Sequence, residues 1–376
     1  MRLLSVELKN FRCFPTVSLH FDHRITLIEG LNGSGKSSLV EALYYACYFK
    51  SFRTNHGAEL IRHGQEAAYI KIICNDDQYI QIGLADKKRV VRFNGKLLTS
   101  YKELISEYRV VVVIEDDIQI IKGAPETRRD FIDQALILYK SNFATLLKTY
   151  RKTLQQRNAL LYFSDRWNYE SYCIWTEKLF TVAEQIRQER LELLDRLESE
   201  VNKLLVEFFP ELSDMSFEYC KAELEEELLA THRDAADEKS ARELKGIEKE
   251  VDEGKVVIRR WISAYGDKER VMRRSLCGPH LDDIRIVFSG KSSRQFASRG
   301  QQKLIAVLLK AALIKILQGK TVIVLDDFMT DFDDIRMQAL LKLFISYGTH
   351  VICTTPSRQS ALCGYLQEQQ CDVITL

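Results

Sequence analysis

The sequence lacks any run of eighteen apolar residues, and it begins Met1-Arg2-Leu3 rather than with the pattern of a signal peptide. It also lacks an excess of one charge, because 54 basic residues nearly balance 53 acidic ones, for a formal net charge of +1. A nucleic-acid binder of this balance would have to concentrate its cations locally. We therefore expect a cytoplasmic protein without a membrane span, whose overall charge favours no particular partner.

The nine cysteines include no Cys-x-x-Cys pair and no metal-ligand spacing. Several lie in apolar runs, as Cys74 does at the end of residues 69–74. Their odd number argues against a disulfide framework, so we expect small buried thiols in a reducing compartment. With 46% hydrophobic and 28% charged residues, the 376-residue chain has the composition of an ordinary globular protein with one large domain or two.

Hydrophobic patterning divides the chain into three regions and predicts an α/β fold. Residues 1–124 are predicted as the strand-rich first part of a head domain, with a hairpin turn at Asn94-Gly95. Residues 125–274 are predicted as a mostly helical insertion, whose acidic part, residues 221–254, is expected to be solvated helix or loop. Residues 275–376 return to short strands and are expected to complete the head.

One stretch matches the phosphate-binding pattern G-x-x-x-x-G-K-[ST] at every specified position, between an apolar run and a predicted helix. Its glycines let successive backbone N–H groups point at a polyphosphate, and the helix dipole adds to the anion site. Lys36 would reach the β- and γ-phosphates, and the Ser37 hydroxyl would ligate Mg²⁺. A chance glycine-rich turn is the alternative. We expect ATP and Mg²⁺ as cofactors, with these ATP-binding residues: Gly30, Leu31, Asn32, Gly33, Ser34, Gly35, Lys36, Ser37 and Ser38.

A second apolar run, residues 321–325, ends in two adjacent acids, Asp326 and Asp327. A phosphate loop needs a carboxylate that holds Mg²⁺ from the end of a neighbouring strand. We expect Asp326 to bind the metal and Asp327 to act as the catalytic general base on the attacking water. An ordinary strand-to-loop junction would look the same, but the nearby phosphate loop favours the metal site.

A short polar segment, Ser298-Arg299-Gly300-Gln301, opens a predicted helix 28 residues before Asp326. Ser298, Gly300 and Gln301 would donate hydrogen bonds to a γ-phosphate at the free helix N-terminus. The order of phosphate loop, S-x-G-Q and strand-Asp-Asp resembles ATP-binding-cassette heads, in which this signature completes the site of the opposite subunit. A polar helix cap explains an isolated S-x-G-Q equally well.

Further motifs give the chain a resemblance to the RecF family, recombination-repair ATPases related to the SMC heads. The resemblance implies an ABC/SMC-type head with a mixed β-sheet and an inserted helical arm. It also implies an ATP-dependent homodimer that clamps double-stranded or gapped DNA and, with RecO and RecR, promotes RecA loading. The motifs span nearly the whole chain and are Asn10-Phe11-Arg12, Ser51-Phe52-Arg53-Thr54, Arg128-Arg129-Asp130-Phe131-Ile132-Asp133 and Gly278-Pro279-His280-Leu281-Asp282-Asp283.

Some positions depart from the family pattern or have a plainer explanation. Thr354-Thr355 stands where many cassette ATPases place a histidine, so the γ-phosphate sensor is unassigned, as is the glutamine loop. Arg129 and Asp133, four residues apart on a helix, form either a surface ion pair or a DNA or interdomain contact. His280 follows Gly-Pro and is expected to be a hydrogen-bonded turn histidine rather than a catalyst.

Basic residues gather in three places that are candidates for DNA contact, although each also suits a solvated face. The candidates are Lys87, Lys88, Arg89, Arg259, Arg260, Arg273 and Arg274. The leucine stripe in residues 179–204 would span roughly 40 Å as a helix, which favours a compact clamp, or an ordinary helical subdomain, over a ring-former. Two other functions remain open: a cassette-type ATPase in transport or defence, and a nucleotide-gated binding module with negligible hydrolysis.

Overall fold

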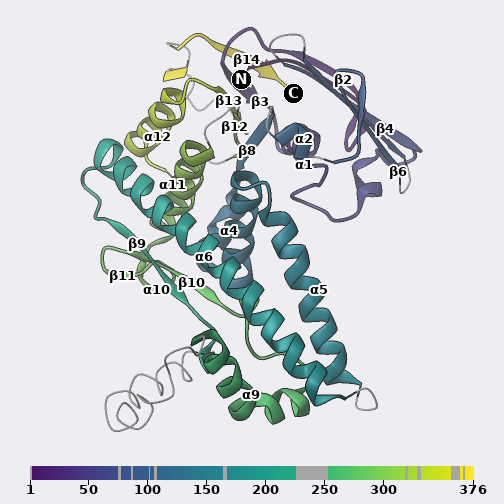
Figure 1. Ribbon diagram of the computed structural model, residues 1–376. Helices are drawn as coiled ribbons and strands as arrows, with labels where there is room; N and C mark the ends of the chain where they lie inside the picture. The colour runs from purple at the N-terminus through teal and green to yellow at the C-terminus, as the bar shows by residue number, and fades with distance from the viewer. Residues whose placement is uncertain are drawn as a thin grey trace. The chain divides into compact units, whose positions relative to one another are not determined.

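The computed structural model (Figure 1) describes residues 2–74, 78–85, 88–100, 102–105, 108–163, 167–225, 253–317, 321–327, 332–356, 365–366 and 369–376. The chain divides into two compact units. Unit 1 comprises Met1–Ile121, Glu200–Asp214 and Phe296–Leu376, and unit 2 comprises Lys122–Ser199 and Met215–Gln295. Across the part of the chain described, no helix combines the length and the apolar character that a membrane crossing needs.

Unit 1 is built on two separate sheets. A five-stranded parallel sheet has the order β14 (Cys371–Thr375), β3 (Ile25–Glu29), β13 (His350–Thr355), β12 (Thr321–Leu325) and β8 (Arg109–Val113). A six-stranded antiparallel sheet has the order β2 (Phe14–His20), β1 (Leu3–Phe11), β4 (Ala67–Cys74), β5 (Tyr79–Ala85), β6 (Lys88–Phe93) and β7 (Lys96–Leu98). The head fold is as expected, except that parallel and antiparallel strands do not share one mixed sheet.

Local sequence accounts for several of these elements. Strands β3, β12 and β13 are buried along their whole length, as expected for the central strands of a parallel sheet. Asn94 and Gly95 both have positive φ, 49° and 79°, as the two-residue turn between β6 and β7 requires. The sequence missed β2, because its residues alternate between half-buried and exposed positions and give only a weak pattern.

The helices of unit 1 pack on these sheets. Helix α1 (Lys36–Tyr48) contacts strands of both sheets and is buried on nearly every side. Helix α11 (Arg299–Leu317) is also almost entirely buried, whereas α12 (Asp334–Ser346) buries one face. The short elements are η1 (Gly57–Leu60), α2 (Lys102–Ile105), η2 (Glu115–Ile118) and α3 (Gln119–Lys122).

Unit 2 is mostly helical, with α4 (Pro125–Tyr139), α5 (Phe143–Tyr162), α9 (Glu253–Met272) and most of α6 (Tyr169–Phe208). It also holds an antiparallel sheet of β11 (Lys291–Ser292), β10 (Asp283–Phe288) and β9 (Met215–Cys220), followed by α10 (Ser293–Phe296). Strand β9 was not expected within the helical region. Because β10 pairs with β9, unit 2 extends to Gln295, whereas the sequence suggested a boundary after residue 274. Most of the acidic segment, residues 226–252, lies outside the described residues.

Candidate functional site

The glycine-rich loop connects β3 to α1 at the carboxyl end of the parallel sheet. Gly33 and Gly35 have φ values of 88° and 110°, a region that residues with a Cβ rarely adopt. A Cβ on Gly35 would also lie 2.5 Å from Phe14 Cζ and 2.8 Å from Cys13 Sγ. The loop conformation therefore requires glycine at position 35 for both its backbone and its surroundings.

Two polar side chains of the loop are arranged for an anion. Lys36 Nζ donates to the carbonyl oxygens of Gly30 (2.8 Å) and Leu31 (3.2 Å), which holds the ammonium against the loop. The Ser34 hydroxyl is buried and has no hydrogen-bond partner among the described residues. A buried hydroxyl without a partner is unfavourable, and an oxygen of a bound phosphate would satisfy it.

The acids after β12 reach the same edge of the sheet, because parallel strands end at one side and β13 lies between β3 and β12. The Asp326 carboxylate is hydrogen-bonded to the hydroxyls of Ser37 and Thr354, the latter at 2.7 Å. Burial raises the pKa of Asp326, an effect that these two hydrogen bonds oppose. The structure thus brings the Ser37 hydroxyl and the Asp326 carboxylate together, and their role as Mg²⁺ ligands stays a prediction.

Thr354, which the sequence left without a role, links the two acids. Its hydroxyl donates to Asp326 Oδ1 and accepts from the Asp327 backbone N–H at 3.0 Å. Asp327 itself has a φ of 45°, an uncommon conformation for a residue other than glycine, and such outliers gather at functional sites. The sequence signal was present in Thr354-Thr355 at the end of β13, but only the fold shows which of the two faces the acids.

The predicted signature residues cap helix α11. The Ser298 backbone N–H donates to Gln301 Oε1 (2.9 Å), and the Gln301 backbone N–H donates to Ser298 Oγ (3.3 Å). This reciprocal pair is a capping box. Arg299 also pairs with Glu115 of η2 at 2.9 Å, which ties the start of α11 to the segment after β8. Among the described residues, no hydrogen bond or ion pair joins Ser298, Gly300 or Gln301 to the glycine-rich loop or to Asp326 of the same chain.

Two motif segments meet in unit 2. Arg128 makes a two-pronged ion pair with Asp283, with N···O distances of 2.7 and 2.8 Å, and Arg129 donates to the Asp282 carbonyl. Of the two roles left open for Arg129 and Asp133, an ion pair with each other is not what the structure shows, because Asp133 pairs with Arg190 of α6 at 2.8 and 2.9 Å. These ion pairs are mostly buried, so they link α4, α6 and β10 inside unit 2 and are not surface ion pairs.

His280, from the second of these segments, is hydrogen-bonded to its surroundings. Its Nδ1 lies 2.6 Å from the Tyr150 hydroxyl, and burial lowers its pKa to about 4. Gly278 in the same turn has a φ of 114°, and a Cβ there would lie 2.3 Å from the Tyr150 hydroxyl. This turn needs glycine at position 278 to bring His280 onto Tyr150.

The basic candidates fall into both units. In unit 1, Lys88 is exposed, whereas Arg89 donates to the Phe49 carbonyl (2.6 Å) and lies over the Phe49 ring; Lys87 lies outside the described residues. In unit 2, the exposed candidates lie on α9 or just after it, and they are Arg259, Arg260, Arg273 and Arg274. Arg89 is therefore partly used within the fold, and unit 2 holds most of the exposed candidates.

A family model described as an AAA domain matches residues 5–255, and the chain belongs to that family. Beyond this class, the chain resembles one kind of protein over nearly its full length. It is 28% identical to the DNA replication and repair protein RecF of Citrifermentans bemidjiense, over 98% of this chain and 97% of that protein. It is 29% identical to the RecF protein of Halothermothrix orenii, over 90% and 88%. The resemblance to RecF that the motifs indicated is confirmed.

Solved structures also match this chain, and they support the resemblance to RecF. The recombination mediator protein RecF in the RecFOR pathway, solved with ATPrS, matches with a TM-score of 0.76 and 27% identity over 96% of this chain and 93% of that one. The Smc head domain of Pyrococcus furiosus matches with a TM-score of 0.51 and 16% identity, over 95% of this chain and 90% of that one. The second likeness shows a shared head fold.

Proposed function

We propose that this chain is an ATP-dependent DNA clamp of the RecF type, which dimerises on ATP and acts at gapped or stalled replication sites. The observation that carries the proposal is the convergence of Lys36, Ser37 and Asp326 at one edge of the parallel sheet. The relatives are named DNA replication and repair proteins, and a similar RecF structure is described with ATP in the RecFOR pathway. By that likeness, RecO and RecR are the proposed partners and RecA loading the proposed outcome.

In this proposal, residues 30–38 hold the phosphates of ATP. Mg²⁺, when bound, neutralises phosphate charge and takes ligands from Ser37 and, directly or through water, from Asp326. The site suits such an ion, because Ser37 and Asp326 already share a hydrogen bond and burial disfavours an unpaired Asp326 charge. The described residues contain no group of three or more metal-binding side chains, which fits an ion that takes most of its ligands from phosphate and water.

Hydrolysis is assigned to Asp327, which Thr354 positions beside Asp326. Asp327 would accept a proton from the attacking water. Ser298, Gly300 and Gln301 would approach the γ-phosphate held by a second copy of the chain, so that ATP stabilises a dimer for as long as the nucleotide stays bound. Slow hydrolysis would then reset the clamp. The exposed arginines of α9, together with Lys88, are the proposed DNA contacts.

Three variants test the site, each against a different step. Lys36→Ala should lose ATP binding, and retained micromolar affinity would contradict the assignment. Ser298→Arg should bind ATP as a monomer but form no ATP-dependent dimer; a dimer in light scattering would exclude a contact across subunits. Asp327→Asn should bind ATP and abolish turnover, whereas equal and negligible turnover in both proteins would favour a nucleotide-gated binding module.

Sizing the protein with ATP and gapped DNA tests the clamp as a whole. The expected result is a complex of two chains on one DNA that forms with ATP and is lost with Lys36→Ala. A dimer that forms with ATP but ignores DNA would point instead to a cassette-type ATPase of another process.

A further inference from the structure

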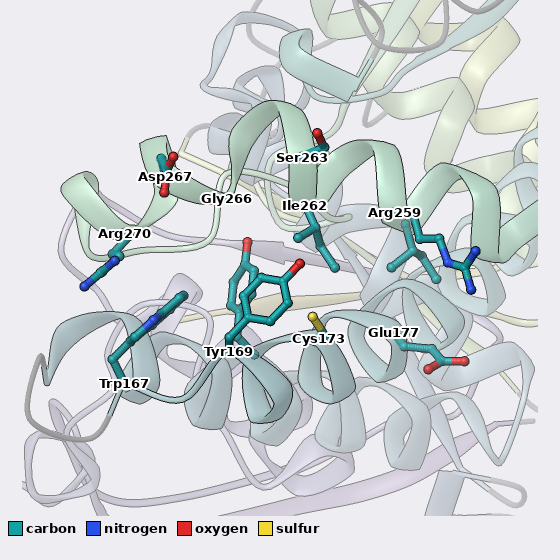
Figure 2. A pocket seen from close by; sticks show the side chains of 12 residues that line it. Trp167, Tyr169, Cys173, Glu177, Arg259, Ile262, Ser263, Gly266, Asp267 and Arg270 are labelled. Atoms are coloured by element: carbon teal, nitrogen blue, oxygen red, sulfur yellow. The ribbon is translucent and has the colours of Figure 1, made fainter.

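Unit 2 carries a groove between the start of α6 and helix α9, with a volume of about 890 Å³. Figure 2 shows the Tyr169 ring projecting from α6 into this space, with Trp167 and Arg270 at one end and Arg259 and Glu177 at the other. Tyr169 is 63% exposed, at the first residue of α6. An exposed aromatic ring that lines a groove offers a flat face on which a planar ligand group can stack.

A second hollow of about 410 Å³ continues the groove, because it shares Trp167, Asp267 and Arg270 with the first. It adds Tyr162, which is 57% exposed, and Arg273. We call the two hollows together the aromatic groove. From Arg259 to Arg270 alone it follows α9 for three turns, or about 16 Å at 1.5 Å per residue.

Two rings of the aromatic groove each lie against an arginine. The Arg270 guanidinium lies 4.9 Å from the centre of the Trp167 ring, and that of Arg273 lies 5.8 Å from the Tyr162 ring. The acids on its walls are Glu177 and Asp267, and the three arginines that line it, Arg259, Arg270 and Arg273, outnumber them. Stacking surfaces interleaved with cations suit a flexible polyanion whose rings are free to stack.

We propose that the aromatic groove binds a single nucleic-acid strand, with bases stacked on Tyr162 and Tyr169 and phosphates beside Arg259, Arg270 and Arg273. A duplex fits less well, since its base faces are already covered by neighbouring bases. The inference deepens the proposed function and rests on it for the nucleic acid, because a clamp at a gap meets single-stranded as well as double-stranded DNA. It needs neither ATP nor a second subunit.

The test is fluorescence anisotropy of the full chain, without nucleotide, with a labelled oligonucleotide of about 15 deoxythymidines, near the upper site size of single-strand binders. Tyr169→Leu keeps apolar bulk but removes the ring, and should weaken binding by about 5-fold to 100-fold. Tyr169→Phe keeps the ring and should bind as the wild type does. Arg273→Gln should lower the slope of log affinity against log salt concentration by about 0.7.

Tyr139→Leu is the matched control, because Tyr139 also lies against an arginine of unit 2, Arg196 at 5.3 Å, but away from the groove. It should leave strand binding unchanged. Equal affinity for the duplex, equal losses in Tyr169→Leu and Tyr139→Leu, or no binding of the oligonucleotide at all would each overturn the proposal. If the oligonucleotide does not bind at all, a protein partner would be the next candidate ligand of the aromatic groove.

The two proposals fail separately. Lys36→Ala should abolish ATP-dependent dimerisation on gapped DNA yet keep the nucleotide-free affinity for the single strand. Tyr169→Leu should keep ATP-dependent dimerisation on gapped DNA but weaken nucleotide-free binding of the single strand. If either variant lost both dimerisation and single-strand binding, the aromatic groove would not act independently of the ATP site.

Discussion

We expect His350 to make the stability of unit 1 sensitive to mild acid. The side chain is fully buried at the start of β13, where its Nδ1 accepts from the Leu3 backbone N–H and its Nε2 lies 3.0 Å from the Thr26 hydroxyl. It therefore bridges the antiparallel sheet, through β1, and the parallel sheet, through β3. A proton on Nδ1 would abolish the bond to Leu3 and place an unpaired charge between the sheets.

Burial lowers the pKa of His350 from 6.5 to about 4, helped by Arg2 and opposed by Asp372. Between pH 6.5 and pH 4, His350 is protonated in the unfolded chain but neutral in the folded chain. The free energy of unfolding therefore falls as the pH falls through this range. The contribution is fully present above pH 6.5. Its loss reaches about 2 kcal/mol at pH 5 and about 3 kcal/mol at pH 4, at about 1.4 kcal/mol for each pH unit. Below pH 4 both states carry the proton and the loss stops.

The measurement is urea unfolding at pH 7.5 and pH 5 for the wild type and His350→Asn, whose side-chain oxygen can still accept from Leu3. The variant should lose about 2 kcal/mol less than the wild type between the two pH values. His63→Asn, at an exposed position of the same unit, should behave as the wild type does. His280 also has a pKa of about 4, but it is present in every protein compared and cancels from the difference. Equal pH dependence in wild type and His350→Asn would refute the reasoning.

Three further predictions concern Asp326, the two loop glycines and the Arg190–Asp133 ion pair. Asp326→Asn should raise the melting temperature of the nucleotide-free protein by a few degrees while abolishing Mg²⁺-dependent ATP binding, since burial raises the pKa of this carboxyl; a lower melting temperature would contradict this. Gly33→Ala should destabilise by about 1–2 kcal/mol through its backbone alone, and Gly35→Ala by more, because a Cβ at Gly35 overlaps neighbouring side chains and one at Gly33 meets nothing. Urea unfolding that ranks them in the opposite order would show that the loop relaxes. Arg190→Leu should lower the free energy of unfolding by about 3–5 kcal/mol, because it leaves the Asp133 carboxylate buried without its ion-pair partner. Adding Asp133→Leu should restore most of this loss, which a double-mutant cycle would detect.

Sequence patterns predicted the elements that carry a clear local signal. Residues 321–325 form strand β12 as expected, and the turn at Asn94 needs no tertiary information. Strand β9 was missed although residues 215–219 alternate apolar and polar side chains, because the segment is short and its partner, β10, lies more than 60 residues later in the chain. Long-range pairing of this kind leaves no local signal, and it also moves the end of unit 2.

The candidate site was predicted unevenly for a similar reason. Glycine spacing and a strand that ends in acids are local patterns, so the loop and Asp326 were accessible from sequence. The partners of polar side chains were not: Thr354 reaches Asp326 only because β13 lies beside β12. Likewise, the four-residue spacing of Arg129 and Asp133 suggested an ion pair within one helix. Spacing along one helix carries no information about a partner on another helix, such as Arg190, which pairs with Asp133.

The signature segment shows that two explanations of one motif need not compete. The capping box uses acceptors only: Ser298 Oγ and Gln301 Oε1 each receive a backbone N–H. A serine hydroxyl keeps its own proton while it accepts, and a glutamine side chain keeps its two amide protons. A phosphate is solely an acceptor, so the groups it needs are the donors that the box leaves available, together with backbone N–H groups of the first turn, such as that of Gly300. If the proposed ATP-dependent dimer forms, the cap would hold these donors in place before the second subunit binds, and this would lower the entropy cost of ordering them.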